Sequence, residues 1–293
     1  MTDALQHLVN GLVSGSAYAL LGASFALIFS VTGRFHFAYS LTYVVGPVVT
    51  VIAIEQGVPL LPAIVLGILA STALGALIEL LVYRPIESRA GATSLLAVAI
   101  ASLAVTIVGE NVIQLAWSSQ PARFISGFKI ELIQIGSIKL TSLDLITVIV
   151  SWVAIAALVY MLAATGFGRS VHAVRSQPAM ARLVGVSPSR VGLVVFAIGS
   201  LLSAVLGTLA SLKTAAAPDI GFQPLFYAFV VAFLAGVDRS PLWIGLVGLA
   251  LGVVESMSTL VISGIWSTTF VFGILFLYFI VEAARSRQIL VAR

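Results

Sequence analysis

Residues 143–164 read LDLITVIVSWVAIAALVYMLAA. Apart from Asp144 near its beginning, this stretch carries no charged side chain. A helix needs about 20 mainly apolar residues to cross the hydrocarbon core of a bilayer, and backbone polar groups in lipid must bond within the protein. No stretch of the chain shows the alternating pattern of about ten residues that a membrane β-barrel strand requires. The stretch therefore predicts a transmembrane helix.

The same apolar character extends to both sides of this stretch. Eight further segments have it: 8–32, 37–54, 59–82, 93–117, 191–212, 223–236, 241–262 and 266–282. The segments 37–54 and 223–236 are short for a full crossing, so each is either a plain span or a broken helix that lines a cavity. We expect an all-α, polytopic helical membrane protein with about eight or nine transmembrane helices, built as a single transmembrane domain over residues 1–293.

The composition agrees with a chain that lies almost entirely in a membrane. Of the 293 residues, 60% are hydrophobic and 9% are charged, and the mean hydropathy is +1.15. Soluble chains carry roughly 25% charged residues. Too few polar side chains are present to cover a soluble surface, which excludes an ordinary cytosolic enzyme, a nucleic-acid-binding protein and a disordered chain.

The distribution of Lys and Arg predicts the orientation, because cytoplasmic loops are enriched in both residues. Three regions carry most of the arginines: the loop 83–92, the stretch 165–190 and the C-terminal tail. Placing all three in the cytoplasm puts the loop 118–142 outside, where its alternating apolar residues suggest a small hairpin. The N-terminus is then outside and the C-terminus cytoplasmic, and the first apolar run is a retained span, too long for a cleaved signal peptide.

The residues that catalysis or metal binding would need are absent or scattered. The chain has no cysteine, and its three histidines, His7, His36 and His172, lie far apart in the sequence. No HExxH, GxSxG or GxxxxGK[ST] pattern occurs, so no metalloprotease, hydrolase or built-in ATPase is expected. We expect a non-enzymatic protein without a metal or cofactor of its own. If ATP powers it, other subunits bind the ATP and Mg²⁺.

Carboxylates inside the apolar segments are candidate functional residues, since an ionisable group is costly in the membrane. Glu110 and Gln114 share a helix face, four residues apart, and Glu255 lies midway along the eighth apolar segment. These side chains either bond between helices or line a translocation path. Glu79 lies five residues before Arg84, and an ion pair between the two at the membrane interface is its simpler interpretation.

The longest basic loop holds a short helix of its own. Ser176 or Gln177 can cap this helix, with Pro178 at its first position. Gly185 can end it, and Arg182 then faces the side opposite to its apolar residues. A basic, partly apolar helix that is too short to span either lies against the bilayer or docks into a groove of a partner protein.

Several motifs along the chain resemble those of a known family. The sequence GFGRSVHAVRSQPAMARLVGV at 166–186 resembles the cytoplasmic loop of the branched-chain amino acid ABC importer permeases. Other matches fall in the family's order: Gly11-Leu12 with Tyr18-Ala19-Leu20, Glu79 with Tyr83-Arg84-Pro85, and Gly248 and Gly252 with Glu255-Ser256. The resemblance covers nearly the whole chain.

This resemblance implies the permease subunit of an ABC importer in the bacterial inner membrane. Its partners would be a second permease, identical or homologous, two cytoplasmic ATPase subunits and an extracytoplasmic substrate-binding protein, in contact with membrane lipid and without nucleic acid. The solute moved inward would be small and organic: amino acid-like, an amide, or an aromatic or carboxylate compound. The segment 166–190 would couple to the ATPases through these residues: Arg175, Gln177, Ala179, Arg182, Leu183 and Gly185.

Two other classes of function remain as alternatives. In a stand-alone secondary transporter or channel, Glu110 and Glu255 would be proton or ion sites. That class does not account for the short cytoplasmic helix. A membrane-embedded enzyme is the third class, and the sequence contains no catalytic constellation to support it.

The predicted pathway lies beside breaks between helices. Segments 33–43 and 233–243 each place glycine beside polar residues between two apolar runs, which suggests a weak internal repeat. The alternative is that both are ordinary cytoplasmic turns, which we slightly favour for Asp238 and Arg239. Where the family commonly has Asn-Phe-Ala-His-Gly, this chain reads HFAYS, and aromatic residues this dense suit an apolar or aromatic solute. We assign the substrate pathway to these residues: His36, Phe37, Tyr39, Tyr43, Glu110, Gln114 and Glu255.

Overall fold

The computed structural model describes residues 2–91, 94–117, 119–124, 131–136, 138–261, 266, 269–274, 276–278 and 280. Its elements are α1 (Thr2–Thr32), α2 (Tyr39–Glu55), α3 (Leu60–Ile78), the π-helical turn η1 (Glu79–Tyr83), α4 (Arg84–Ala90), α5 (Ser94–Ala116), β1 (Leu132–Ile135), β2 (Ile138–Thr141), α6 (Ser142–Ala164), α7 (Gly166–Ser176), α8 (Pro178–Leu183), α9 (Pro188–Lys213), α10 (Phe222–Ala235) and α11 (Pro241–Ser258). α3, η1 and α4 run on as one helix.

Six helices in the described part of the chain are long and apolar enough to cross a membrane: Asp3–Thr32, Leu60–Arg89, Ser94–Ala116, Ser142–Ala164, Pro188–Lys213 and Pro241–Ser258. α2 and α10 have 17 and 14 residues, as short as their sequences suggested. The predicted segment 266–282 lies only partly within the described residues, and the arginines of the C-terminal tail lie outside them. The prediction of an all-α, polytopic membrane protein is confirmed.

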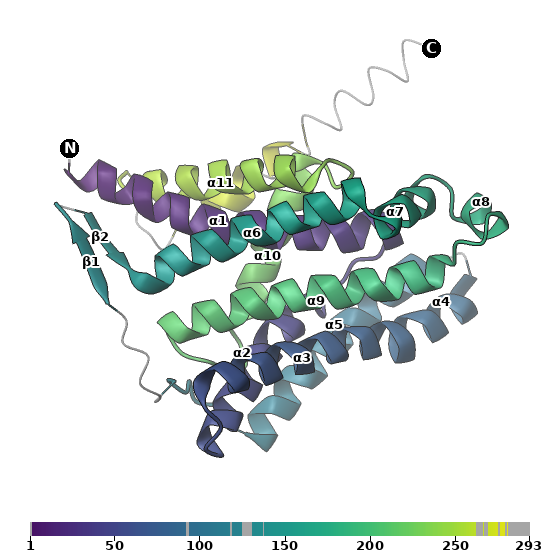
Figure 1. The fold of residues 1–293 in the computed structure, drawn as a ribbon, viewed down its shortest axis with the longest axis horizontal. Coiled ribbons are helices and arrows are strands. Elements are labelled where there is room, and N and C mark those ends of the chain that lie inside the picture. Colours follow the sequence, from purple (N-terminus) through teal and green to yellow (C-terminus); the bar gives the residue numbers. More distant parts are fainter. Residues whose placement is uncertain are drawn as a thin grey trace, which may run out of the picture.

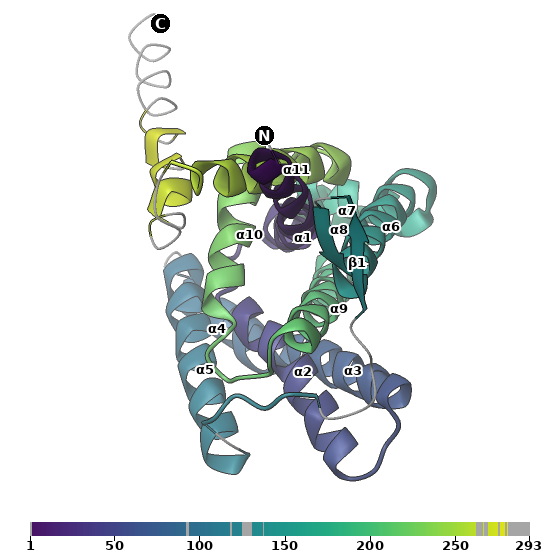
Figure 2. The ribbon, with the colours of Figure 1, turned by 90° about the vertical axis from the view of Figure 1, so that its left-hand side faces the viewer.

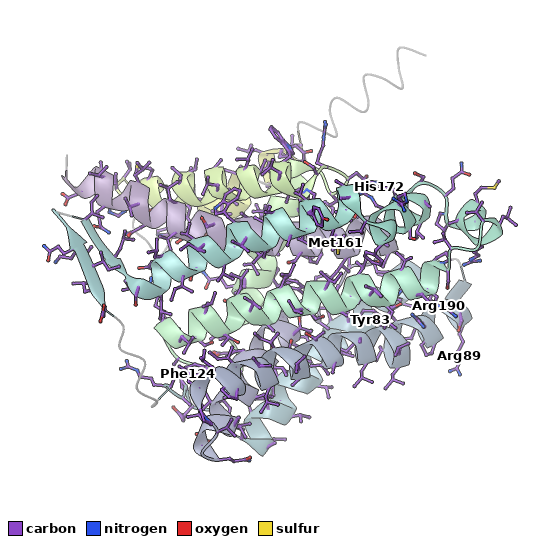
Figure 3. All side chains as sticks on the ribbon, in the orientation of Figure 1. Tyr83, Arg89, Phe124, Met161, His172 and Arg190 are labelled. Carbon is purple, nitrogen blue, oxygen red and sulfur yellow. The ribbon has the colours of Figure 1, made fainter. Side chains whose placement is uncertain are left out.

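The helices run between two ends of the bundle (Figure 1). At one end, β1 and β2 pair antiparallel, and the backbone N–H of Lys139 donates a 2.8 Å hydrogen bond to Gln6 of α1. We call this the hairpin end, because the hairpin predicted within the loop 118–142 is present there. α7, α8 and the end of α4 lie at the other end, with the side chains of Arg89 and Arg190 (Figure 3). We call it the α8 end.

α1 packs closely against α11. Figure 2, seen from the hairpin end, shows α1 beside α11 and α2 beside α3. Glycine allows the approach: a Cβ added to Gly252 would lie 2.3 Å from the Cα of Gly15, and one added to Gly248 would lie 2.6 Å from the Cα of Ala19. A side chain at either position would push the two helices apart, which explains the small residues at this spacing.

α2 begins inside the bundle instead of at its edge. α1 ends at Thr32, and residues 33–38 return the chain inward without helix, starting with Gly33 at a φ of +66°, which glycine adopts without strain. Tyr39, the first residue of α2, bonds through its hydroxyl to Ser24 at 2.6 Å. Ser24 lies eight residues before the end of α1, so α2 begins about 12 Å inside the α8 end.

α10 begins next to the start of α2. α9 reaches the hairpin end at Lys213, and residues 214–221 lead back into the bundle. A Cβ added to Gly221, which precedes α10, would lie 2.4 Å from the carbonyl oxygen of Ser40. Ser203 of α9 donates a hydrogen bond to the preceding carbonyl of α2, and it lies ten residues before the end of α9. Both short helices therefore begin about 15 Å inside the hairpin end.

The second break lies elsewhere than the sequence indicated. Residues 236–240 form the turn between α10 and α11, and Arg175 of α7 holds this turn at the α8 end by an ion pair with Asp238 at 2.9 Å. The inward break that corresponds to 33–38 is 214–221. A turn and a break carry the same glycine and polar residues. For Asp238 and Arg239 the sequence slightly favoured a turn, and they lie in one.

Candidate translocation and coupling sites

The tyrosines predicted at the first break hold α2 in place. Tyr39 is fully buried, and its ring meets Phe25 of α1 edge-on with 5.9 Å between ring centroids. Tyr43 is 6% exposed, and a Cβ added to Gly207 of α9 would lie 2.0 Å from its carbonyl oxygen. These two residues anchor α2 against α1 and α9.

His36 is also a buried residue of the core. Its Nδ1 lies 2.8 Å from the hydroxyl of Tyr83, and its ring meets Phe196 edge-on at 4.9 Å. Because Tyr83 belongs to η1, this contact ties the break before α2 to the π-helical turn. A buried, hydrogen-bonded histidine of this kind positions neighbouring elements.

A phenylalanine cluster lies between the first break and α10. Its members are Phe25, Phe29, Phe35, Phe37, Phe229 and Phe233. Phe37 stacks on Phe229 at 5.7 Å between ring centroids, and all members except Phe25 are half-buried. Of the predicted pathway residues, Phe37 alone belongs to the cluster. The sequence did carry a signal for the rest, because Phe229 and Phe233 are four residues apart and so share a face of α10.

Glu110 is buried on α5 and short of hydrogen bonds. Its side chain is 9% exposed, and its Oε1 has no partner in the part of the chain that the structure describes. Asp219, an exposed residue of the break 214–221, lies two residues before Gly221, which packs against Ser40 at the start of α2. Gln114, one turn further along α5, is exposed, so the predicted polar face divides into a buried acid and a surface amide. Asp219 was not among the predicted residues.

Glu255 bonds between helices. It is 8% exposed and accepts a hydrogen bond from the hydroxyl of Tyr227 on α10. The Tyr227 ring stacks on Tyr18 of α1, with 4.1 Å between centroids. Glu255 thereby joins α1, α10 and α11, and it shares no partner with Glu110 among the described residues.

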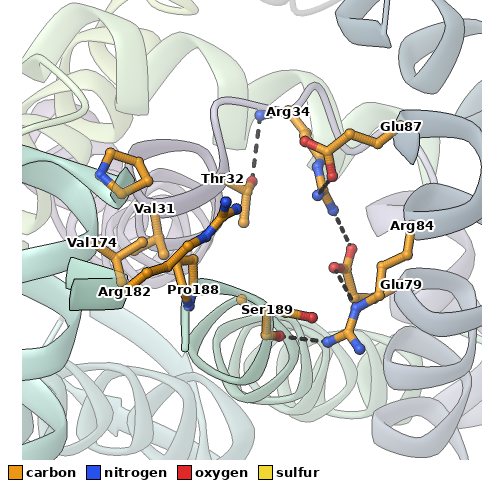
Figure 4. A pocket seen from close by; sticks show the side chains of 12 residues that line it. Val31, Thr32, Arg34, Glu79, Arg84, Glu87, Val174, Arg182, Pro188 and Ser189 are labelled. Carbon is orange, nitrogen blue, oxygen red and sulfur yellow. Dashed lines mark hydrogen bonds and ion pairs between the residues drawn. The ribbon is translucent and has the colours of Figure 1, made fainter. Parts of the chain in front are cut away.

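A network of four charged side chains surrounds η1. Glu79, 2% exposed, accepts hydrogen bonds from Arg34 and from Arg84, the latter at 3.3 Å. Arg34 also pairs with Glu87, and Arg84 donates to the carbonyl of Ser189 on α9 (Figure 4). The predicted pair of Glu79 and Arg84 is present, but the contact with Arg34 links it to the break before α2. π-Helical turns of this kind recur at functional sites.

The same network lines a cavity at the α8 end. The cavity has a volume of about 200 Å³, and α8 contributes Pro178 and Arg182 to its wall (Figure 4). Val31 and Thr32 at the end of α1 form another part of it. α8 and the break before α2 therefore face one shared space.

The predicted coupling segment forms two helices, α7 and α8. Pro178 begins α8, and Gly185, at a φ of +83°, follows its end, as the sequence indicated. α8 buries Ala181 and leaves three apolar side chains exposed: Met180 at 57%, Leu183 at 80% and Val184 at 76%. Of the predicted coupling residues, all but the half-buried Arg175 are exposed: Gln177, Ala179, Arg182, Leu183 and Gly185.

Comparison with known proteins agrees with these features. The family described as "Branched-chain amino acid transport system / permease component" matches residues 7–280. The high-affinity branched-chain amino acid transport system permease protein BraD of Pseudomonas aeruginosa is 28% identical over 93% of this chain and 92% of its own length. LivH of Escherichia coli K12, named in the same way, is 28% identical over 94% of this chain and 93% of its own.

One solved structure shares the fold. PsaBC from Streptococcus pneumoniae, in complex with Fab, has a TM-score of 0.51 and 15% identity, over 92% of this chain and 89% of that chain. The helices of membrane length and the relatives identify a multi-pass protein of the inner membrane. The family match spans nearly the whole sequence. The chain belongs to the permease components of the branched-chain amino acid transport systems.

Proposed function

We propose that this chain is the membrane-spanning subunit of an ABC importer that moves a small organic solute inward. The observation that carries the proposal is α8, whose exposed side chains Met180, Leu183 and Val184 form an apolar patch on a basic segment. Contiguous apolar patches of this kind mark interaction sites. The names of the relatives support an amino acid-like solute.

The charges of the two ends favour one orientation. Eight arginines lie at the α8 end: Arg34, Arg84, Arg89, Arg169, Arg175, Arg182, Arg190 and Arg239. Three cations lie at the hairpin end within the described residues: Arg123, Lys139 and Lys213. Because cytoplasmic segments carry an excess of basic residues, this distribution supports an orientation with the α8 end inside and the N-terminus outside.

The coupling step follows from the position of α8. On the cytoplasmic side, an ATPase subunit would cover the apolar patch, and closure of two such subunits around ATP would displace α8. Arg182 lines the cavity that the Arg34–Glu79 pair also lines, so this displacement reaches the break before α2. Rigid-body movement of packed helices is an established way to switch between outward and inward openings.

The solute path would run where α2 and α10 begin. Phe37 and the half-buried phenylalanines beside it offer an apolar surface, which suits a solute with aliphatic or aromatic groups. Glu110 would lie on the path. His36, Tyr39, Tyr43 and Glu255 would act through the helices that they hold.

Other subunits would complete the importer. A second permease, identical or homologous, would complete the path, and an extracytoplasmic binding protein would deliver the solute at the hairpin end. ATP and Mg²⁺ would bind to two cytoplasmic ATPase subunits. This chain would catalyse no covalent chemistry itself.

The test is energised uptake in cells that carry the complete set of subunits. Labelled L-leucine, L-phenylalanine, and an amide and a carboxylate of similar size are offered to cells with and without this chain. The proposal predicts chain-dependent uptake of at least one solute, which arsenate abolishes by depleting ATP and a proton ionophore spares. Uptake that the ionophore abolishes and arsenate spares would instead indicate a secondary transporter.

A charge reversal tests the coupling segment in the same assay. Arg182→Glu should lower uptake at least tenfold at an unchanged membrane level, because it places a carboxylate in a cavity wall that already holds Glu79 and Glu87 and reverses the charge of the docking surface. Arg169→Glu, on the exposed side of α7, is the matched control and should retain most of the uptake. Normal uptake by Arg182→Glu would remove α8 from the coupling mechanism.

A further inference from the structure

The break 214–221, which leads back to the start of α2, carries an acid. Gly221, at its end, lies about 15 Å inside the hairpin end, beside the start of α2. Asp219, two residues earlier, is exposed. Irregular backbone at membrane depth is tolerated only where it is buried in protein or lines a water-filled cavity, and an exposed acid there requires water. At that depth Asp219 would therefore need an aqueous space around it.

A second acid, Glu110 of α5, also lies near the start of α2. Glu110 is 9% exposed, and its Oε1 is buried without a hydrogen-bond partner in the described part of the chain. The neighbouring Gly109 packs against Leu41, since a Cβ there would lie 2.4 Å from the leucine methyl group. The acid thus lies where α2 and α10 begin.

Within the described part of the chain, these carboxylates have no cation paired with them. Among the described residues, neither forms an ion pair, and Lys213, the basic residue that precedes the break, is held by Asp144 at 2.6 Å. Asp219 does not cap α10 either, because no hydrogen bond from the first turn of α10 reaches it in the described structure. A buried, unpaired carboxylate is costly, and a cation placed between two of them removes much of that cost.

We propose that Glu110 and Asp219 together form a binding site for the ammonium group of the transported solute. This inference rests on the proposed transport function and names a feature of the solute: a primary ammonium group on a molecule that also has apolar surface. The exposed Asp219 would meet the cation first. Glu110 would bind the ammonium group once that group has lost its water. The phenylalanine cluster would contact the apolar part of the solute.

The test measures whether this place attracts cations, and it does not depend on transport. The chain has no cysteine, so Gln223→Cys, exposed in the first turn of α10, introduces a single thiol near the two acids. Opened membranes holding the whole complex are treated with a cationic reagent, trimethylammonium-ethyl methanethiosulfonate, or an anionic one, sulfonato-ethyl methanethiosulfonate. The result is the ratio of the two reaction rates.

Neutral replacements of the two acids then test whether they cause the preference for the cationic reagent. Asp219→Asn and Glu110→Gln should each lower the ratio roughly fivefold, and both together should lower it further, because each removes a negative charge near the start of α10. Glu55→Gln, an exposed acid at the far end of α2, is the matched control and should leave the ratio unchanged. Since Asp219 is exposed, its replacement does not depend on repacking of the core.

Two results would overturn the inference: an unchanged ratio in the doubly neutralised protein, or no reaction of Gln223→Cys with either reagent. Neither result would contradict the proposed function, because the uptake assay and Arg182→Glu test that function separately. Conversely, loss of ATP-driven uptake with a normal charge preference would leave the cation site in place and remove its connection to transport.

Discussion

Replacing Arg34 or Glu79 with glutamine tests the charged network that joins the first break to η1. Glu79 is 2% exposed and Arg34 is 13% exposed, so little water is available to replace either partner. Removing one member of a buried pair costs about 3–5 kcal/mol. Arg84 still contacts Glu79 at 3.3 Å after Arg34→Gln, so we expect the lower end of that range.

A double-mutant cycle isolates the pair itself. The apparent free energy of unfolding is measured for Arg34→Gln, Glu79→Gln and the double variant, by titrating the purified protein in mixed micelles with a denaturing detergent and following the fluorescence of its four tryptophans. The sum of the two single losses should exceed the loss in the double variant by about 1–3 kcal/mol, which is the coupling energy of the pair. Arg169→Gln, at an exposed position, should change stability by no more than about 0.5 kcal/mol.

A coupling energy below about 0.5 kcal/mol would refute the reasoning, because residues in direct contact in a desolvated network should not behave independently. The same result would weaken the proposed link between α8 and the break before α2. Loss of stability equal to that of Arg169→Gln would do so as well. Either outcome is accessible whether or not the solute is identified.

Two further predictions concern packing and orientation. Gly252→Ala should lower the free energy of unfolding by about 1–3 kcal/mol, because its Cβ would lie 2.3 Å from the Cα of Gly15. Gly192→Ala is the control and should leave stability unchanged, because the nearest neighbour of its Cβ lies at 3.8 Å. Thermal unfolding of the two proteins measures the difference. In intact cells a cysteine at Ser119 should react with an impermeant thiol reagent, and one at Ser176 should react only after lysis; the reverse pattern would invert the orientation.

Local signals in the sequence predicted much of the fold. The apolar segments predicted the long helices because crossing a membrane requires one kind of composition. Pro178 and Gly185 predicted the two ends of α8, since proline suits a first helical turn and glycine adopts a positive φ. The pair of Glu79 and Arg84 was predictable because both lie on one helix.

The remainder of the site depends on contacts between distant residues. Arg34 and Glu79 are 45 residues apart, and nothing near either one in the sequence specifies the other. The break 214–221 reads TAAAPDIG, and small residues with proline are typical of a surface loop, so Asp219 gave no signal of its place near the start of α2. The dense aromatic residues after α1 suggested a solute path, whereas the packing of α1 and α9 buries Tyr39 and Tyr43.

Site-specific photo-crosslinking at Leu183 tests the central claim most directly. A photoreactive benzoyl-phenylalanine at this position, 80% exposed on α8, should form a crosslink in living cells to a cytoplasmic subunit that mass spectrometry identifies by its ATP-binding GxxxxGK[ST] sequence. The same residue at Leu115, 89% exposed on α5 near the hairpin end, should form none. No ATPase at Leu183, or an equal yield of ATPase at Leu115, would contradict the account of this chain as an importer subunit coupled through α8.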